Sequence, residues 1–349
     1  MSTNPLRSRY EELKSEISKH NYLYHVKDAP VISDLEFDRL LNELKQIEAE
    51  HPDWITPDSP TQRAGSKPAD RFEKVRHPAP ILSLANAFGA DDARAWFERI
   101  RKIDDRVEKT KFVVEPKIDG LSVVLHYRDG FFVQGATRGD GEIGEEITAN
   151  LRTIRALPLR IPVDPDGPMP PAELVVRGEA FITIREFEAL NQRLSEAGEK
   201  TYLNPRNTAA GSLRQLDPGL TAQRPLNLLV YAIVAGSGEF PPTQRGRLAY
   251  LQALGFPVPV AEFSDNLDEA ILACEASAQR RDALGFEVDG AVIKIDDLRL
   301  AEDLGFVGKD PRGALAFKFP AREVTTRLRE IRVNVGRTGV LTPYAVLEP

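Results

Sequence analysis

Residues 112–137 constrain the fold most, because they contain consecutive strand patterns separated only by short turns. Residues 112–114 are apolar, 115–120 read Glu-Pro-Lys-Ile-Asp-Gly, and apolar side chains then alternate with others from Leu121 onward. This pattern predicts a strand–turn–strand junction that presents Lys117 at a strand end. Asp129-Gly130 lies between two further strand patterns and is the commonest two-residue hairpin signal, so the segment is expected to be antiparallel.

Lys117 is a candidate nucleophile. A free ammonium has a pKa of about 10.4 and is a poor nucleophile, but desolvation or nearby cations lower that pKa readily. Asp119, two residues on, has the chemistry to hold or deprotonate the amine. The alternative is a surface turn lysine paired with an aspartate, and a Lys-x-Asp-Gly match alone does not distinguish the two.

Three later strand patterns each carry isolated charge. Glu179 lies in an apolar run at 174–182 and needs a partner, which is Arg177, another base or a ligand hydroxyl, because an unpaired buried charge is costly. Lys294 and Lys318 end the runs at 286–294 and 314–320. Together with Lys117 they give three strand lysines that can converge on a phosphate.

The first 50 residues predict two helices packed as a hairpin, because apolar residues recur at helical spacing in both halves. Residues 33–36 form a capping box at the start of the second helix. Asp34 and Asp38 share a face there with Phe37, near Tyr24-His25. These acids either complement the helix dipole or form, with the aromatic rings, a site for a planar cation.

Arginines mark three further segments. Arg138 stands in a flexible loop at 137–141 and suits a phosphate or ribose, although a solvated turn arginine is an equal alternative. Arg206 and Arg214 are eight apart among small residues, which favours contact with a polyanion. Arg281 lies near a helix end, where it also complements the dipole. Helices are expected at 93–103, 142–157, 183–198, 244–254 and 267–284, with a strand at 226–234.

Composition limits the class of protein. The 349 residues are 42% hydrophobic and 28% charged, contain no leader-like or membrane-length apolar run, and so predict a cytoplasmic globular protein. Cys274 is the single cysteine, which excludes an intramolecular disulfide and a cysteine-cluster zinc site. The net charge of −7 means that any contact with nucleic acid comes from a local basic patch or from parts outside this sequence.

Taken in order, these motifs resemble those of the bacterial NAD-dependent DNA ligases, within the covalent nucleotidyltransferases. The resemblance covers nearly the whole chain. It rests first on the order of the four strand patterns described above, which carry Lys117, Glu179, Lys294 and Lys318. It rests also on these flanking segments: Tyr24-His25 with Asp34-x-x-Phe37-Asp38, Thr61-Gln62-Arg63, Ala136 to Gly141, Asn204 to Pro218, and Val335 to Gly339.

The resemblance implies that Lys117 attacks the adenylyl phosphorus of NAD, giving lysyl-AMP and nicotinamide mononucleotide. Glu115 would then read the adenine amino group and Glu179 the ribose hydroxyls, while Asp119 belongs to the nucleophile's motif. The other residues that the resemblance assigns are the adenine-bordering Ser83 and Leu84, the sugar-phosphate contacts Arg138, Lys294 and Lys318, the phosphate or DNA contacts Arg206, Arg214 and Arg281, and the nicotinamide contacts Tyr24, His25, Asp34, Leu35, Glu36, Phe37 and Asp38.

The expected fold is α+β: a helical nicotinamide-binding subdomain at 1–74, a nucleotidyltransferase domain of antiparallel sheets and helices at 75–320, and a linker with the first strands of an OB-fold at 321–349. Magnesium or manganese is expected as cofactor and zinc is not. The family's remaining C-terminal modules are not in this sequence, so a monomeric adenylation fragment is expected that adenylates itself, binds nicked duplex DNA weakly and seals poorly.

Three residues depart from the family pattern. Phe37 replaces a usual tyrosine, Ala85 a usual aspartate and Gly313 a usual tryptophan. An NTP-using ligase or capping enzyme is the alternative within the superfamily, and a catalytically silent NAD-sensing or scaffold module is the alternative outside it.

Overall fold

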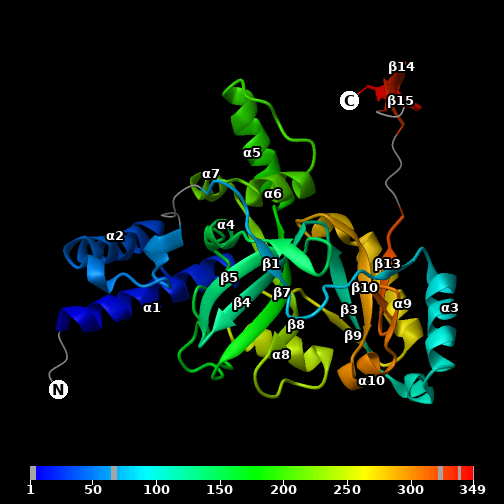
Figure 1. Cartoon of the computed structure of the whole chain (residues 1–349), viewed down its shortest axis with the longest axis horizontal. Coiled ribbons are helices and arrows are strands. Elements are labelled where there is room, and N and C mark those ends of the chain that lie inside the picture. The colour runs from blue at the N-terminus through cyan, green and yellow to red at the C-terminus, as the bar shows by residue number, and fades with distance from the viewer. Residues whose placement is uncertain (1–4, 64–68, 321–324, 337–338, 349) are drawn as a thin grey trace. The chain divides into compact units, whose positions relative to one another are not determined.

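The N-terminal helical hairpin has the predicted form. The computed structural model describes residues 5–63, 69–320, 325–336 and 339–348. Helices α1 (Pro5–His25) and α2 (Asp34–Glu50) pack side by side (Figure 1) around Tyr10, Leu13 and Leu44. Ser33 caps α2, and Glu36 returns the bond to the Ser33 main chain, so the capping box is confirmed.

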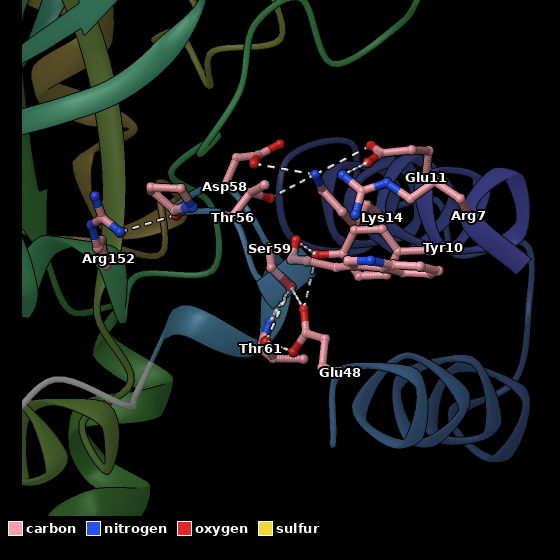
Figure 2. A network of polar contacts seen from close by, with 12 residues as sticks. Arg7, Tyr10, Glu11, Lys14, Glu48, Thr56, Asp58, Ser59, Thr61 and Arg152 are labelled. Atoms are coloured by element: carbon pink, nitrogen blue, oxygen red, sulfur yellow. Dashed lines mark hydrogen bonds and ion pairs between the residues drawn. The ribbon is translucent and has the colours of Figure 1, made fainter. Parts of the chain in front are cut away.

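A buried polar network fixes the two 3₁₀ turns η1 (Pro52–Trp54) and η2 (Pro60–Arg63) to this hairpin. Figure 2 shows Lys14 directed toward Thr56 and Asp58, and the Lys14–Asp58 ion pair measures 3.2 Å. The buried carboxylate of Glu48 accepts hydrogen bonds from the Ser59 and Thr61 hydroxyls. Each buried charge therefore has a partner, as its desolvation requires.

Two arginines connect η2 and its loop to the rest of the first unit. Arg63 donates to the carbonyl oxygens of Arg152, Ile154 and Leu157 at 3.1, 2.8 and 2.9 Å. In the other direction Arg152 donates to the carbonyl of Pro57 at 3.0 Å. Main-chain carbonyls rather than carboxylates thus hold the Arg63 guanidinium.

The main body of the first unit, which spans Met1–Lys318, contains a four-stranded antiparallel sheet. Its strand order is β5-β4-β7-β8, formed by β4 (Leu121–Arg128), β5 (Phe131–Thr137), β7 (Glu173–Phe181) and β8 (Asn227–Gly236). Asp129 and Gly130 take φ values of 49° and 80°, which a tight two-residue hairpin requires. The predicted hairpin is confirmed.

A five-stranded sheet has the order β2-β13-β10-β3-β9. Its strands are β2 (Ala85–Ala87), β3 (Phe112–Ile118), β9 (Glu262–Ser264), β10 (Val288–Ile295) and β13 (Ala314–Lys318), and all pairs are antiparallel except β13 with β2. β3 and β4 therefore belong to different sheets. The strand–turn–strand prediction for 115–120 is confirmed, but the two strands do not pair as a hairpin.

Gly120 makes this crossing possible. A Cβ atom at Gly120 would lie 2.3 Å from the carbonyl oxygen of Ala180 on β7. Only a residue without a side chain permits so close an approach between the turn and the neighbouring strand.

The remaining elements flank the sheets (Figure 1). They are α3 (Ala90–Arg101), α4 (Thr148–Arg152), α5 (Ile184–Glu196), α6 (Pro205–Leu213), α7 (Pro218–Ala222), α8 (Gln244–Ala253), α9 (Leu267–Gln279), α10 (Leu298–Asp303), η3 (Asp105–Lys109), η4 (Arg281–Ala283), the pair β1 (Lys74–Arg76) with β6 (Ile143–Glu145), and the pair β11 (Phe306–Val307) with β12 (Asp310–Pro311).

Two predicted helices are too long. The helix expected at 142–157 is wrong over most of its length, because residues 143–145 form β6 and pair with β1, which leaves only α4 helical. The main-chain groups of β6 are engaged in the sheet and are not available to a helix. The helix expected at 267–284 ends at Gln279 and continues as the short turn η4.

The second unit, Phe319–Pro349, contains one antiparallel pair, β14 (Leu328–Val335) with β15 (Leu341–Leu347). Of the side chains in these two strands, only Val346 is partly buried. Arg337 and Thr338 lie outside the described residues, and the OB-fold stays a prediction. In the described part of the chain no helix is long and apolar enough to cross a membrane.

Candidate active site

A cavity of about 1080 Å³ is lined by residues of both large sheets. Strand β3 contributes Glu115 and Lys117, β10 and β13 contribute Lys294 and Lys318, and β7 contributes Glu179. The three strand lysines, which were predicted to converge, therefore line one cavity together with Glu179. The volume is at the upper end of the range for small-molecule and cofactor sites.

Lys117 is held by Asp289, an acid that the sequence reasoning missed. The Lys117 ammonium lies 2.9 and 3.0 Å from the two carboxylate oxygens of Asp289, and Lys318 donates to one of them at 2.7 Å. Burial opposes ionisation of Asp289, but the hydrogen bonds from the two lysines outweigh it and lower its pKa. Asp119, expected to hold the amine, instead accepts from Arg206 at 2.7 Å.

Sheet register explains this placement. Gly290 on β10 is opposite Lys117 on one side and Lys318 on the other, and the β10–β3 register shifts between Val288 and Gly290. Asp289 therefore occupies the irregular position next to both lysines, where a bulge re-aims a side chain. An acid in an apolar strand was the available signal, the same one that identified Glu179.

Glu115 is almost fully buried, with 2% of its surface exposed. Its carboxylate accepts from Lys294 at 2.8 Å and from the amide of Gln244 at 2.7 Å. The same Gln244 nitrogen donates to the main-chain carbonyl of Tyr231 at 3.0 Å. Sequence reasoning did not identify Gln244, because a glutamine at a helix start carries no distinctive signal.

Glu179 accepts a hydrogen bond of 3.2 Å from the Tyr231 hydroxyl. Burial raises the pKa of Glu179 to about 7 and that of Tyr231 to about 12. Arg177, one of the partners considered for Glu179, donates instead to the Ser122 hydroxyl and to the Leu82 carbonyl, each at 3.1 Å. Glu179 thus lines the cavity with a pKa near neutral pH.

Other predicted residues also line the cavity: Ser83, Leu84, Asp119, Arg138, Arg206 and Arg214. The Arg214 guanidinium lies 2.8 Å from the Glu145 carboxylate, and the Lys74 ammonium lies 3.4 Å from the same carboxylate. Glu145 and Lys74 also line the cavity, and sequence reasoning missed both. Arg281 lies in η4 and is not among the lining residues.

The predicted nicotinamide residues lie on the helical hairpin, and none of the described residues that line the cavity comes from 5–63. Tyr24 is half exposed, with its ring centroid 4.7 Å from that of His25, and burial lowers the pKa of His25 to about 4. Phe37 packs on the hairpin core, and Glu36 serves the capping box. Asp34, Leu35 and Asp38 are exposed. Their role toward nicotinamide stays a prediction.

The described residues contain no group of three or more His, Cys, Asp or Glu side chains able to hold a metal ion. Beside the cavity Asp289 contacts two lysines, and within its lining Glu115 contacts one lysine and Asp119 an arginine. These three carboxylates are paired with cations, which leaves them poorly suited to bind a metal ion.

Family models match most of the chain. Residues 69–322 match the NAD-dependent DNA ligase adenylation domain, and residues 3–65 match the DNA ligase-like, N-terminal NAD+-binding domain. The chain belongs to the NAD-dependent DNA ligase adenylation domain family.

Curated relatives agree with this assignment. The DNA ligase of Chloroflexus aurantiacus is 53% identical over 357 residues, which cover 100% of this chain and 50% of the relative. The DNA ligase of Roseiflexus castenholzii is 52% identical over 358 residues, which cover 100% and 49%. The chain thus spans about half the length of these relatives. The structure is also similar to the ATP-dependent DNA ligase of bacteriophage T7 in complex with ATP, with 12% identity, a TM-score of 0.35 and coverage of 76% and 80%. That similarity is too low to carry a conclusion.

Gly313, a departure from the DNA ligase pattern, has a local structural explanation. A Cβ atom at Gly313 would lie 2.6 Å from the Cβ of Ala301 on α10. In this chain α10 fills the space that a larger residue at 313 would need.

Proposed function

We propose that Lys117 attacks the adenylyl phosphorus of NAD, so that lysyl-AMP forms and nicotinamide mononucleotide leaves. The Lys117 ammonium first gives up a proton to Asp289 or to solvent. The neutral amine then forms a nitrogen–phosphorus bond while a phosphorus–oxygen bond of the pyrophosphate breaks, and the nitrogen loses a second proton to solvent or to the departing phosphate. One observation carries the proposal: Lys117 lines the same cavity as Glu115 and Glu179, and its ammonium shares the Asp289 carboxylate with Lys318.

The charges of the site suit this reaction. Lys318 and Lys294 supply fixed positive charge in a partly buried cavity, where it stabilises developing charge on phosphate more than in water. Asp289 bridges Lys117 and Lys318, and its negative charge offsets the repulsion between the two ammonium groups. Glu115 reads the adenine amino group, Glu179 accepts from the ribose hydroxyls, Arg138 contacts the sugar-phosphate, and Ser83 and Leu84 border the base.

For the whole protein we propose DNA ligation, the sealing of nicks in duplex DNA during replication and repair inside the cell. The named relatives are DNA ligases, and Arg206 and Arg214 on the cavity rim suit DNA phosphates. The proposed functional segments are the hairpin region 1–74 for the nicotinamide half, 75–320 for adenylation and 321–349 as the start of an OB-fold. A monomer is expected.

A divalent ion, Mg²⁺ or Mn²⁺, stays an expectation. The described protein residues offer no ligand set, so such an ion would be bound mainly by the phosphates of the nucleotide. Adenylation by NAD should then stop in excess EDTA and resume when magnesium is added back. Unchanged adenylation in EDTA would show that the lysines suffice.

Intact mass spectrometry tests the proposed reaction. The protein is first stripped with excess nicotinamide mononucleotide, then incubated with NAD or with ATP. An AMP adduct is expected with NAD only. Lys117→Ala should form no adduct, whereas Lys111→Ala, an exposed lysine paired with Asp265 outside the cavity, should react as the parent does.

Two outcomes contradict the proposal. An adduct from ATP but not from NAD would identify an NTP-using nucleotidyltransferase. Binding of NAD without release of nicotinamide mononucleotide would identify a catalytically silent NAD-sensing module.

A further inference from the structure

Gln244 connects the two sheets at the base-reading end of the cavity. It is the first residue of α8, and 4% of its surface is exposed. Its amide nitrogen donates to the Glu115 carboxylate at 2.7 Å and to the Tyr231 carbonyl at 3.0 Å. Glu115 belongs to β3 of the five-stranded sheet, and Tyr231 to β8 of the four-stranded sheet. An amide nitrogen has two hydrogens, so both of its donors are used.

Gln244 and Lys294 both hold the Glu115 carboxylate. Gln244 donates to Oε1, whereas the Lys294 ammonium donates to Oε2 and also lies 2.8 Å from Oε1. Glu115 lies opposite Val292 in the sheet, with Lys294 two residues farther along β10, so the lysine approaches diagonally. Each carboxylate oxygen has two lone-pair sites, so the two hydrogen bonds leave capacity for a further donor from the cavity that Glu115 lines.

Without Gln244 the buried carboxylate would lose the one neutral hydrogen-bond donor that the described residues give it. Lys294 would then hold it alone, on a flexible chain whose ammonium also lies 5.3 Å from the Tyr231 ring. The carboxylate would keep the ammonium, which lies near both of its oxygens, but would lose the directional bond that Gln244 makes to Oε1 from a second element. Its plane would then be fixed less closely relative to the cavity.

We propose that Gln244 is a positioning residue for base selection: it orients Glu115 so that a free lone pair of the carboxylate accepts from the exocyclic amino group of adenine. Gln244 is not among the residues that line the cavity, so it would act through Glu115. This inference rests on the proposed function, in which NAD supplies the adenylyl group. It predicts discrimination against a base with a carbonyl oxygen in place of the amino group, since two acceptors then face each other.

The test compares NAD with nicotinamide hypoxanthine dinucleotide, which carries that carbonyl oxygen. The ratio of kcat/KM for the two dinucleotides is measured by adduct formation for the parent chain and for Gln244→Met, which keeps the size and removes the donors. We expect the ratio to fall by about tenfold or more in Gln244→Met, mainly through a loss with NAD. Gln252→Met, an exposed glutamine on the same helix, should leave the ratio unchanged.

A second variant keeps the test decisive if Gln244→Met does not fold. Gln244→Asn keeps the amide but is one methylene shorter, so it cannot reach both acceptors, and the same fall is expected. If folded variants lose activity with both dinucleotides equally, Gln244 has a structural role only and the inference is overturned. If the parent chain forms no adduct with NAD, the proposed function itself fails, and this inference fails with it.

Discussion

Replacing Arg63 tests how the helical hairpin region is attached to the sheets. Arg63 donates three hydrogen bonds of 2.8 to 3.1 Å to main-chain carbonyls: one belongs to Arg152, the last residue of α4, and the others to Ile154 and Leu157 just after it. Burial lowers its pKa to about 10, so it remains charged at neutral pH. Arg63→Met removes all three donors and leaves the carbonyls enclosed.

The magnitude follows from those three bonds. Each would be worth ~1.5–3 kcal/mol as a charge-assisted bond, but the desolvation of the guanidinium offsets part of this, so ~1 kcal/mol per bond remains. We expect Arg63→Met to lower the free energy of unfolding by ~3 kcal/mol. Arg63→Lys keeps the charge but not the planar fork, so it should lose ~1–2 kcal/mol.

Urea unfolding followed by far-ultraviolet circular dichroism measures the effect. With a slope of ~3 kcal/mol per molar urea, the Arg63→Met midpoint should fall by ~1 M. Arg193→Met, at an exposed position in α5, is the matched control. If the two variants differ by less than ~0.5 kcal/mol, the carbonyl contacts of Arg63 contribute nothing to attachment and the reasoning is wrong.

Two further predictions concern stability. The pKa of Glu179 rises from 4.5 to about 7 on folding, so the folded state binds the proton more tightly and stability falls as the pH rises from about 4.5 to about 7. Glu179→Gln should remove this fall, at most ~3 kcal/mol, in unfolding curves taken at pH 4.5 and 7.5; parallel pH dependence in both proteins would contradict it. Gly313→Ala should lower stability by ~1–3 kcal/mol, because its Cβ would lie 2.6 Å from the Cβ of Ala301 and 2.9 Å from its Cα. Ala301→Gly removes only the first of these contacts, so the loss should be smaller, but not absent, in that background. Equal losses in the two backgrounds would exclude the clash between the two Cβ atoms.

Local patterns were enough for many of the elements and for most candidate residues. The hairpin at Asp129-Gly130 and the capping box at 33–36 depend on residues within a few positions of one another, and both were predicted. Glu179, Lys294 and Lys318 were identified because a charge in an apolar strand needs a partner. The failure at 142–157 has the opposite cause: pairing with β1, some seventy residues earlier, overrode the helical pattern.

The sequence by itself determined which charges are present on which strands, and the family to which their order belongs. Only the tertiary structure decided which charges meet. Lys117 pairs with Asp289, 172 residues away, rather than with Asp119 beside it, because β10 lies between β3 and β13 and its bulge aims Asp289 at both lysines. Glu115 meets Gln244, 129 residues away, because α8 begins where the two sheets approach. The physical reason is that the partner of a buried charge is set by sheet order and register, which no short stretch of sequence encodes.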